Sequence, residues 1–143
     1  MHTFSRLSKS ANFSKIYKFY DGINSLLTLG FDKSWRERAS QKLTGSTVLD
    51  LGSGTGAAEK QLVDFEVTAI DPDERMLSLN NFSNKIIGSA ESLPFDDKTF
   101  DSIYCAFVWR NVSDVDVAFK EIFRVLKDDG NFVLLDMTRP LNT

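Results

Sequence analysis

The stretch that decides the fold is Val48-Leu49-Asp50-Leu51-Gly52-Ser53-Gly54-Thr55-Gly56. A short apolar run that contains one acidic residue near its end is typical of a buried strand, and three glycines at alternate positions indicate a tight turn. Residues 57–62 then favour the start of a helix. Glycine suits such a turn because it tolerates a positive φ and lets a ligand approach the backbone. Strand, turn and helix start together predict a nucleotide-binding loop whose free N–H groups face the ligand.

Asp50 distinguishes between the ligands that such a loop binds. The spacing of Gly52, Gly54 and Ala57 also satisfies the looser dinucleotide fingerprint, so the glycines alone leave NAD or FAD open. A carboxylate gains nothing beside an anionic pyrophosphate, whereas it attracts the sulfonium and ammonium groups of S-adenosylmethionine (SAM). We therefore expect SAM. An NAD(P)-dependent oxidoreductase and a glycine-rich turn without a ligand are the alternatives.

The composition predicts one globular domain and excludes several kinds of chemistry. The chain has 143 residues, of which 42% are hydrophobic, and a net charge of −3, which argues against a nucleic-acid partner. Cys105 is the only cysteine and His2 the only histidine, so we expect no disulfide framework, no metal site and no histidine-based catalysis. The longest apolar run, 103–109, is too short to cross a bilayer. We expect a cytoplasmic protein.

Residues 1–45 predict a helical leader. The apolar residues Phe13, Ile16, Tyr17 and Tyr20 recur at helical spacing, and Gly30 is placed to end the segment. We expect Asp32 to cap a further helix over 33–43. The first twenty residues are basic, so an organelle transit peptide is an alternative interpretation of this end of the chain.

Residues 46–143 alternate between strand and helix patterns, which predicts a parallel sheet with crossover helices. We expect strands at 47–51, 66–70, 84–87, 101–106 and 131–136, and helices near 57–64, 74–80 and 114–126. Ser113 is expected to cap the last helix, with Lys127 and Gly130 at its exit. Its buried stripe is expected to consist of Val115, Ala118, Phe119, Ile122 and Leu126.

Three later segments are expected in the crevice beside the glycine loop, because ligands of open α/β sheets bind at the carboxyl ends of the strands. Asp71 ends the second strand, where an acid can accept both hydroxyls of a ribose; its alternative role is to cap the next helix. Residues 89–95 follow the third strand and are placed to contact adenine. Residues 104–112 bring aromatic residues and Arg110-Asn111 to the crevice. Core packing of Phe107 and Trp109 and a surface ion pair of Arg110 are the alternatives there.

Several motifs resemble the UbiE/Coq5 family of quinone-biosynthesis C-methyltransferases, from about residue 13 to residue 140. The glycine loop resembles motif I of class I SAM-dependent methyltransferases. Residues 20–24, 27–30 and 35–36 are similar to the family's first signature, 110–112 to its Arg-Asn-Val and 124–130 to its second signature. The resemblance implies a Rossmann-like α/β fold with sheet order 3-2-1-4-5, helices on both faces, and residues 1–45 as a lid.

The resemblance also implies functional residues. Thr55, Asp71, Ser89, Ala90 and Ala106 fall on positions that contact SAM in the family. With the loop and its surroundings, the expected cofactor residues are Asp50, Gly52, Ser53, Gly54, Thr55, Asp71, Met76, Ser89, Ala90, Glu91 and Ala106. The implied reaction is methylation of a ring carbon of a phenol or hydroquinone. Arg110 would stabilise the phenolate and Asn111 would orient it, while the ring slot would be lined by Tyr20, Phe107 and Trp109. A prenyl tail would give at most peripheral membrane contact.

The chain also departs from the family. Asp32, Asp128-Asp129, Ala106 and Asp136 stand where the family usually has His, Pro-Gly, Ser and Glu. Members of the family continue with two more strands after the fifth. We therefore expect the apolar edge at 131–136 to be covered by a second copy in a homodimer, or the chain to be a fragment. A SAM-binding homologue that is catalytically idle or regulatory is a further alternative.

Overall fold

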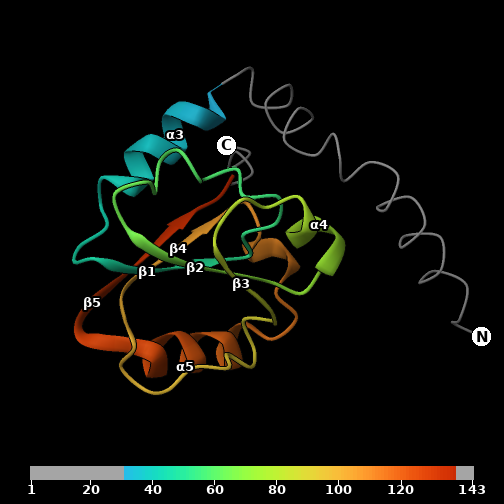
Figure 1. Ribbon diagram of the computed structural model, residues 1–143. Coiled ribbons are helices and arrows are strands. Elements are labelled where there is room, and N and C mark those ends of the chain that lie inside the picture. Colours follow the sequence, from blue (N-terminus) through green and yellow to red (C-terminus); the bar gives the residue numbers. More distant parts are fainter. Residues whose placement is uncertain (1–30, 138–143) are drawn as a thin grey trace, which may run out of the picture.

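The computed structural model describes residues 31–137, and its centre is a five-stranded parallel sheet of order β3-β2-β1-β4-β5 (Figure 1). The order expected from the resemblance is confirmed. The strands are β1 (Thr47–Leu51), β2 (Glu66–Asp71), β3 (Asn84–Ile87), β4 (Phe100–Ala106) and β5 (Leu126–Leu135). The helices are α3 (Asp32–Ser40), α4 (Glu74–Ser78), the 3₁₀ turn η2 (Trp109–Asn111) and α5 (Val115–Val125). The expected helical pattern before Gly30 lies outside the described residues.

Helices cover both faces of the sheet, with α3 on one side and α5 on the other (Figure 1). Because successive side chains of a strand point to opposite faces, the central strands supply two cores. Leu49, Leu51, Ile103 and Cys105 pack with α5. Val48, Tyr104 and Ala106 pack with Ala39 and Leu43 on the α3 side. Asp50 has the parity of Val48, so its carboxylate belongs to the α3 side of the sheet.

The segment after the glycine loop is not the regular helix expected over 57–64. It is a run of turns in which the N–H groups of Glu59 and Gln61 bond three residues back, while Leu62 bonds both three and four residues back. The mixed pattern replaces a continuous four-residue ladder. Ala58 and Leu62 are nevertheless buried, so the segment still contributes an apolar face.

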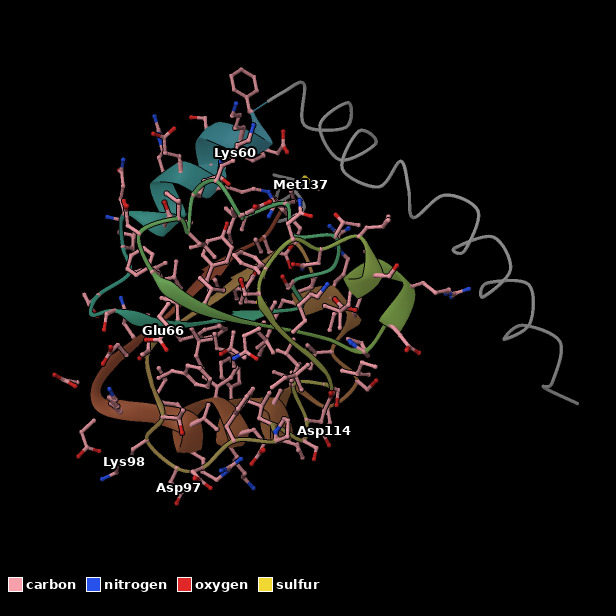
Figure 2. The ribbon with its side chains drawn as sticks, viewed as in Figure 1. Lys60, Glu66, Asp97, Lys98, Asp114 and Met137 are labelled. Carbon is pink, nitrogen blue, oxygen red and sulfur yellow. The ribbon has the colours of Figure 1, made fainter. Side chains whose placement is uncertain are left out.

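Three expected helix ends are wrong. Asp114, not Ser113, caps α5, because its carboxylate accepts a 3.1 Å hydrogen bond from the N–H of Val117. Figure 2 labels Asp114 beside one end of this helix. Asp32 lies inside the first turn of α3 and Phe31 is the N-cap. α5 ends at Val125 and β5 begins at once with Leu126, so Lys127 and Gly130 lie in a strand rather than at a helix exit.

The buried stripe of α5 also differs from expectation. Its buried residues are Ala118, Ile122 and Val125, whereas Val115 and Phe119 are partly exposed. Phe119 instead takes part in an aromatic group, its ring lying 5.0 Å from that of Trp109. The first turn of α5 is therefore more exposed to solvent than its sequence pattern predicts.

Candidate functional site

A cavity of about 350 Å³ opens at the carboxyl ends of β1, β2 and β4. It contains every residue that the sequence assigned to the cofactor. Those residues come from the glycine loop, the end of β2, the turn into α4, the loop after β3 and the end of β4, and all of them line one space. The cavity is also lined by Arg36, Asp73, Val108 and Asn111. Asn80 supports its wall by donating a hydrogen bond to the Gly54 carbonyl.

The glycine loop needs its glycines for two separate reasons. Gly52 has a φ of +72° and Gly54 a φ of +55°, values that side chains rarely adopt. A Cβ at Gly52 would also overlap the side chain of Val108, which lines the cavity. At Gly54 a Cβ would come within 3.0 Å of Met76 Cε. The loop thus keeps the backbone close to the space that a ligand would fill.

A buried chain of polar side chains holds the loop in place. The Ser53 hydroxyl donates a 2.7 Å hydrogen bond to Asp50 Oδ2, and Asn80 Nδ2 donates a 2.8 Å bond to Ser53 Oγ. Asn80 also donates to the Gly54 carbonyl at 3.0 Å. Asn80 carried no sequence motif, and its role was not expected. Its buried amide joins the loop to the end of α4.

Asp50 is an ionisable group in a site that disfavours its charge. Its residue is 3% exposed, and burial raises the pKa of the carboxyl from 3.8 to about 6, although the Ser53 hydroxyl and Arg36 act in the opposite direction. A buried carboxylate whose pKa is strongly raised by desolvation is more typical of a ligand site than of a hydrophobic core. The cavity therefore offers a negative group suited to a cationic ligand.

Asp71 lies beside the glycine loop and lines the same cavity. Its Oδ2 accepts the Gly54 N–H at 3.0 Å and its Oδ1 accepts the Asp73 N–H at 2.8 Å. Burial raises its pKa, opposed by these two backbone bonds. Each oxygen retains a lone pair, so the carboxylate can accept two further donors, as a vicinal diol requires. Helix capping, the alternative role, belongs to Asp73, which accepts from the N–H groups of Arg75 and Met76.

The loop after β3 connects the cavity to α5. Ala90 is buried, and Glu91 Oε1 accepts the N–H of Ser113 at 2.7 Å and of Asp114 at 3.3 Å. Partial burial raises the pKa of Glu91, but these bonds together outweigh it and the pKa is lowered. Ser89, Ala90 and Glu91 are thus held against the start of α5 while they line the cavity.

Arg36 of α3 is the functional candidate that sequence reasoning missed. Its residue is 7% exposed and lines the cavity, and its guanidinium carbon lies 4.9 Å from the centroid of the Phe107 ring. The signal available in the sequence was its spacing: Arg36, Ala39 and Ser40 share the buried face of α3. A charged residue on an otherwise buried helix face indicates a satisfied partner or a ligand.

Of the described residues that were expected to act on the substrate, only Asn111 lines the cavity. Arg110 does not line it; its guanidinium lies 3.8 Å from Asp136 Oδ1 in a half-exposed ion pair. Phe107 is 4% exposed and supports Arg36 from the α3-side core. The Trp109 ring packs against Phe119 and Phe132, at 5.0 and 5.7 Å. Neither ring lines the cavity, and Tyr20 lies outside the described residues.

Comparison with known proteins identifies the family. A model of the ubiE/COQ5 methyltransferase family matches residues 8–143. The chain belongs to this family. It is 36% identical to a demethylmenaquinone methyltransferase of Thermotoga maritima, over 90% of the chain and 61% of the relative. It is 34% identical to a ubiquinone/menaquinone biosynthesis C-methyltransferase UbiE of Rubrivivax gelatinosus, over 90% of the chain and 55% of the relative.

The fold agrees with this family. A solved SAM-dependent methyltransferase from Thermotoga maritima shares a TM-score of 0.71 at 25% identity, over 85% of this chain and 60% of that one. The chain thus spans about three fifths of the length of the relatives it matches. Family and structural neighbours imply SAM as the cofactor, and a dinucleotide reductase loses its support.

The residues present fit that cofactor. Two buried carboxylates, Asp50 and Asp71, face one cavity, which suits a sulfonium and a diol and opposes a pyrophosphate. Within residues 31–137, no three potential metal ligands gather in one place. The same described region contains no helix long and apolar enough to cross a membrane.

Proposed function

We propose that this chain methylates a ring carbon of a phenolic or hydroquinone precursor in quinone biosynthesis, with SAM as methyl donor. The observation that carries this function is the cavity itself, which is lined by the glycine loop, Asp50 and Asp71. The end of β4 lines the same cavity, and the chain continues from there into Arg110-Asn111. Family membership supports the substrate class.

The cofactor would be held by the residues that already line the cavity. Asp71 would accept the ribose hydroxyls, the 89–91 loop would contact the adenine, and the glycine loop with Thr55, Met76 and Ala106 would surround the rest. When bound, SAM supplies a methyl group made electrophilic by a positively charged sulfur. Asp50 would attract that positive charge, and the rigid Asp50–Ser53–Asn80 chain would keep the loop in position.

Arg110 and Asn111 would act on the acceptor. Both belong to the η2 turn that follows β4, and Asn111 reaches the cavity wall. Asn111 would orient the ring hydroxyl. Arg110 would stabilise the negative charge that develops on it, with Asp136 holding the guanidinium until the acceptor binds. Asp136 directly follows Leu135, the register partner of Ala106, so the ion pair adjoins the strand end that lines the cavity.

The aromatic residues would shape the acceptor site in different ways. Tyr20 would form one wall of the ring slot. Trp109 would stiffen the η2 turn through its contacts with Phe119 and Phe132, and Phe107 would act through Arg36. Residues 1–45 would form the lid and 46–143 the core of one domain. A cytoplasmic location with at most peripheral membrane contact completes this assignment.

We also propose that a second copy of the chain covers the free edge of β5. In the described sheet β5 pairs only with β4, and Leu134 on this strand is 41% exposed. Exposed apolar edge strands favour pairing with another chain.

The direct test is transfer of a labelled methyl group from SAM to a demethylmenaquinol by the purified chain. Label in the quinol, dependent on Asn111, supports the proposed enzyme. Tight SAM binding without transfer to any quinol or simple hydroquinone would instead support a catalytically idle or regulatory homologue.

A further inference from the structure

Arg36 carries a positive charge that the described protein leaves without a direct ionic partner. Its residue is 7% exposed, and its Nε is buried without a hydrogen-bond partner. Among the ion pairs formed by residues 31–137, none includes Arg36. A buried cation with free donors is costly unless something else satisfies it.

The guanidinium is nevertheless held in a fixed place. It lies over the Phe107 ring, 4.9 Å from the centroid. Phe107 is itself fixed: it is 4% exposed, has a φ of +60°, and donates its N–H to the Leu135 carbonyl at 2.8 Å. Stacking on a ring uses the flat face of the guanidinium and leaves the N–H groups along its rim for polar neighbours, such as the Tyr104 hydroxyl, and for a ligand. Arg36 is thus positioned like a ligand-binding arginine.

The neighbours of Arg36 define the kind of ligand. Asp50 lines the same cavity, and Arg36 is close enough to oppose the rise in the Asp50 pKa that burial causes. Asp50 Oδ2 already accepts a hydrogen bond from the Ser53 hydroxyl. Arg36 and Asp50 therefore place one positive and one negative group in one part of the cavity. That pattern is complementary to a zwitterion and unfavourable for a ligand that carries only negative charge.

We propose that Arg36 binds the α-carboxylate of the amino-acid end of SAM, and that Asp50 attracts the positive groups beside it. This inference rests on the proposed function only through the identity of the cofactor. Asp71 belongs to β2 and is hydrogen-bonded to the glycine loop. Because β1 lies between β2 and β4, the part of the cavity lined by Cys105, Ala106 and Arg36 is available for the amino-acid end of the cofactor.

The test compares two ligands that differ only in this carboxylate. S-adenosylhomocysteine and its decarboxylated analogue, S-adenosyl-3-thiopropylamine, are titrated calorimetrically into the full chain. Wild type is expected to bind the carboxylated ligand about 10–100-fold more tightly, the range of one or two charge-assisted hydrogen bonds. Arg36→Met is expected to remove this preference while leaving the affinity for the decarboxylated ligand unchanged.

Two variants control the measurement. Arg36→Lys keeps the charge but not the planar pair of donors, so it is expected to restore only part of the preference. Arg38→Met removes an exposed arginine from the same helix and is expected to change neither affinity. Equal losses for both ligands in Arg36→Met would show that Arg36 only supports the fold, and would overturn the inference.

Wild type alone also decides the matter if Arg36→Met does not fold. Equal affinities of wild type for the two ligands would overturn the role of Arg36. Failure of wild type to bind either ligand would overturn the cofactor assignment and this inference with it. A strong preference for the carboxylated ligand without methyl transfer to a quinol would leave Arg36 in place and remove only the proposed reaction.

Discussion

The Ser53 hydroxyl donates a 2.7 Å hydrogen bond to Asp50 Oδ2 inside the cavity wall. Even with this bond, burial raises the pKa of Asp50 from 3.8 to about 6. The native fold thus favours the protonated form of Asp50. The stability that this proton contributes is fully present below about pH 4 and is lost as the pH rises through about 6.

We expect Asp50→Asn to stabilise the ligand-free protein at pH 8 by about 1–3 kcal/mol, since a neutral amide avoids the desolvation of a buried charge. The advantage should shrink as the pH falls below about 6, where wild-type Asp50 takes up its proton. Urea unfolding of both proteins between pH 4 and pH 8 measures this difference. The charge of Asp71 also raises the Asp50 pKa, so relief of this repulsion is part of the expected gain. A constant difference across this range would contradict the account.

The same substitution is expected to weaken SAM binding. Ionised Asp50 attracts the cationic ligand, so wild-type affinity should fall as the pH drops below about 6, whereas the affinity of Asp50→Asn should be lower and depend less on pH. Calorimetric titration at several pH values provides the measurement. A variant that is both more stable and equally tight would show that the carboxylate serves neither stability nor binding.

Asp71→Asn is expected to weaken SAM binding by about 2–3 kcal/mol, because hydrogen bonds to a charged acceptor are the strong ones. The variant also weakens the bonds to the N–H groups of Gly54 and Asp73, so its thermal stability must be measured beside its affinity. Asp114→Asn, which changes the helix cap of α5 and does not line the cavity, is the matched control. Equal losses in the two variants would place Asp71 in the scaffold alone.

Gly52→Ala should disrupt both the loop and the cavity. A left-handed φ costs a non-glycine residue about 1–2 kcal/mol, and the added Cβ would overlap Val108. Val108→Ala in the same chain removes the γ-carbon that overlaps most, but it leaves the Val108 Cβ 2.9 Å away and the backbone strain unchanged, so it should restore only part of the stability. Chemical denaturation of the two single variants and the double variant tests this. Full recovery would show that the φ of Gly52 carries no cost.

Arg110→Met is expected to lower turnover by about 10²–10³-fold while SAM affinity stays nearly unchanged, because the residue would act on charge that develops in the acceptor. Asp136→Asn removes the ion-pair partner of Arg110 and should have a smaller effect. Rate and affinity measured on the same preparations separate the two roles. If affinity and turnover fell together, Arg110 would belong to the cofactor site or the fold.

The free edge of β5 predicts a dimer. Light scattering at micromolar concentration should give twice the mass of one chain. Leu134→Lys, which places a charge on the exposed edge strand, should shift the chain toward the monomer. A wild-type monomer would contradict this part of the proposal.

The sheet and most of the cavity wall were predictable because their signals are local. An apolar run followed by Gly52-x-Gly54 fixes a strand and a turn, and Asp71 must lie beside that turn once the second strand is parallel to the first. The place of Arg36 in the cavity wall was not predictable in this way. It depends on how α3 packs against β4 and on the Phe107 ring, against which the guanidinium stacks. Phe107 itself has a left-handed backbone conformation, and neither feature is encoded by residue spacing alone.

The same reason explains the wrong cap of α5 and the two alternatives that the sequence left open at Trp109. Trp109 follows an apolar strand, which allowed either a ligand slot or core packing; its contacts with Phe119 and Phe132 decide for packing. Those contacts depend on how three successive elements, η2, α5 and β5, pack together, so residue propensity could not choose between the two roles. Ser113 and Asp114 are both good caps by residue type; in the fold the Asp114 carboxylate accepts the Val117 N–H, and Glu91 accepts the N–H groups of both residues.

The central claim is that the cavity between the glycine loop and Asp71 is a SAM site. Calorimetric titration of the purified chain with SAM, S-adenosylhomocysteine and NADH tests it most directly. We predict one binding site for each of the two adenosyl ligands, weakened by Asp71→Asn, and no heat of binding for NADH. Binding of NADH, or no binding of either adenosyl ligand to a folded chain, would contradict the account.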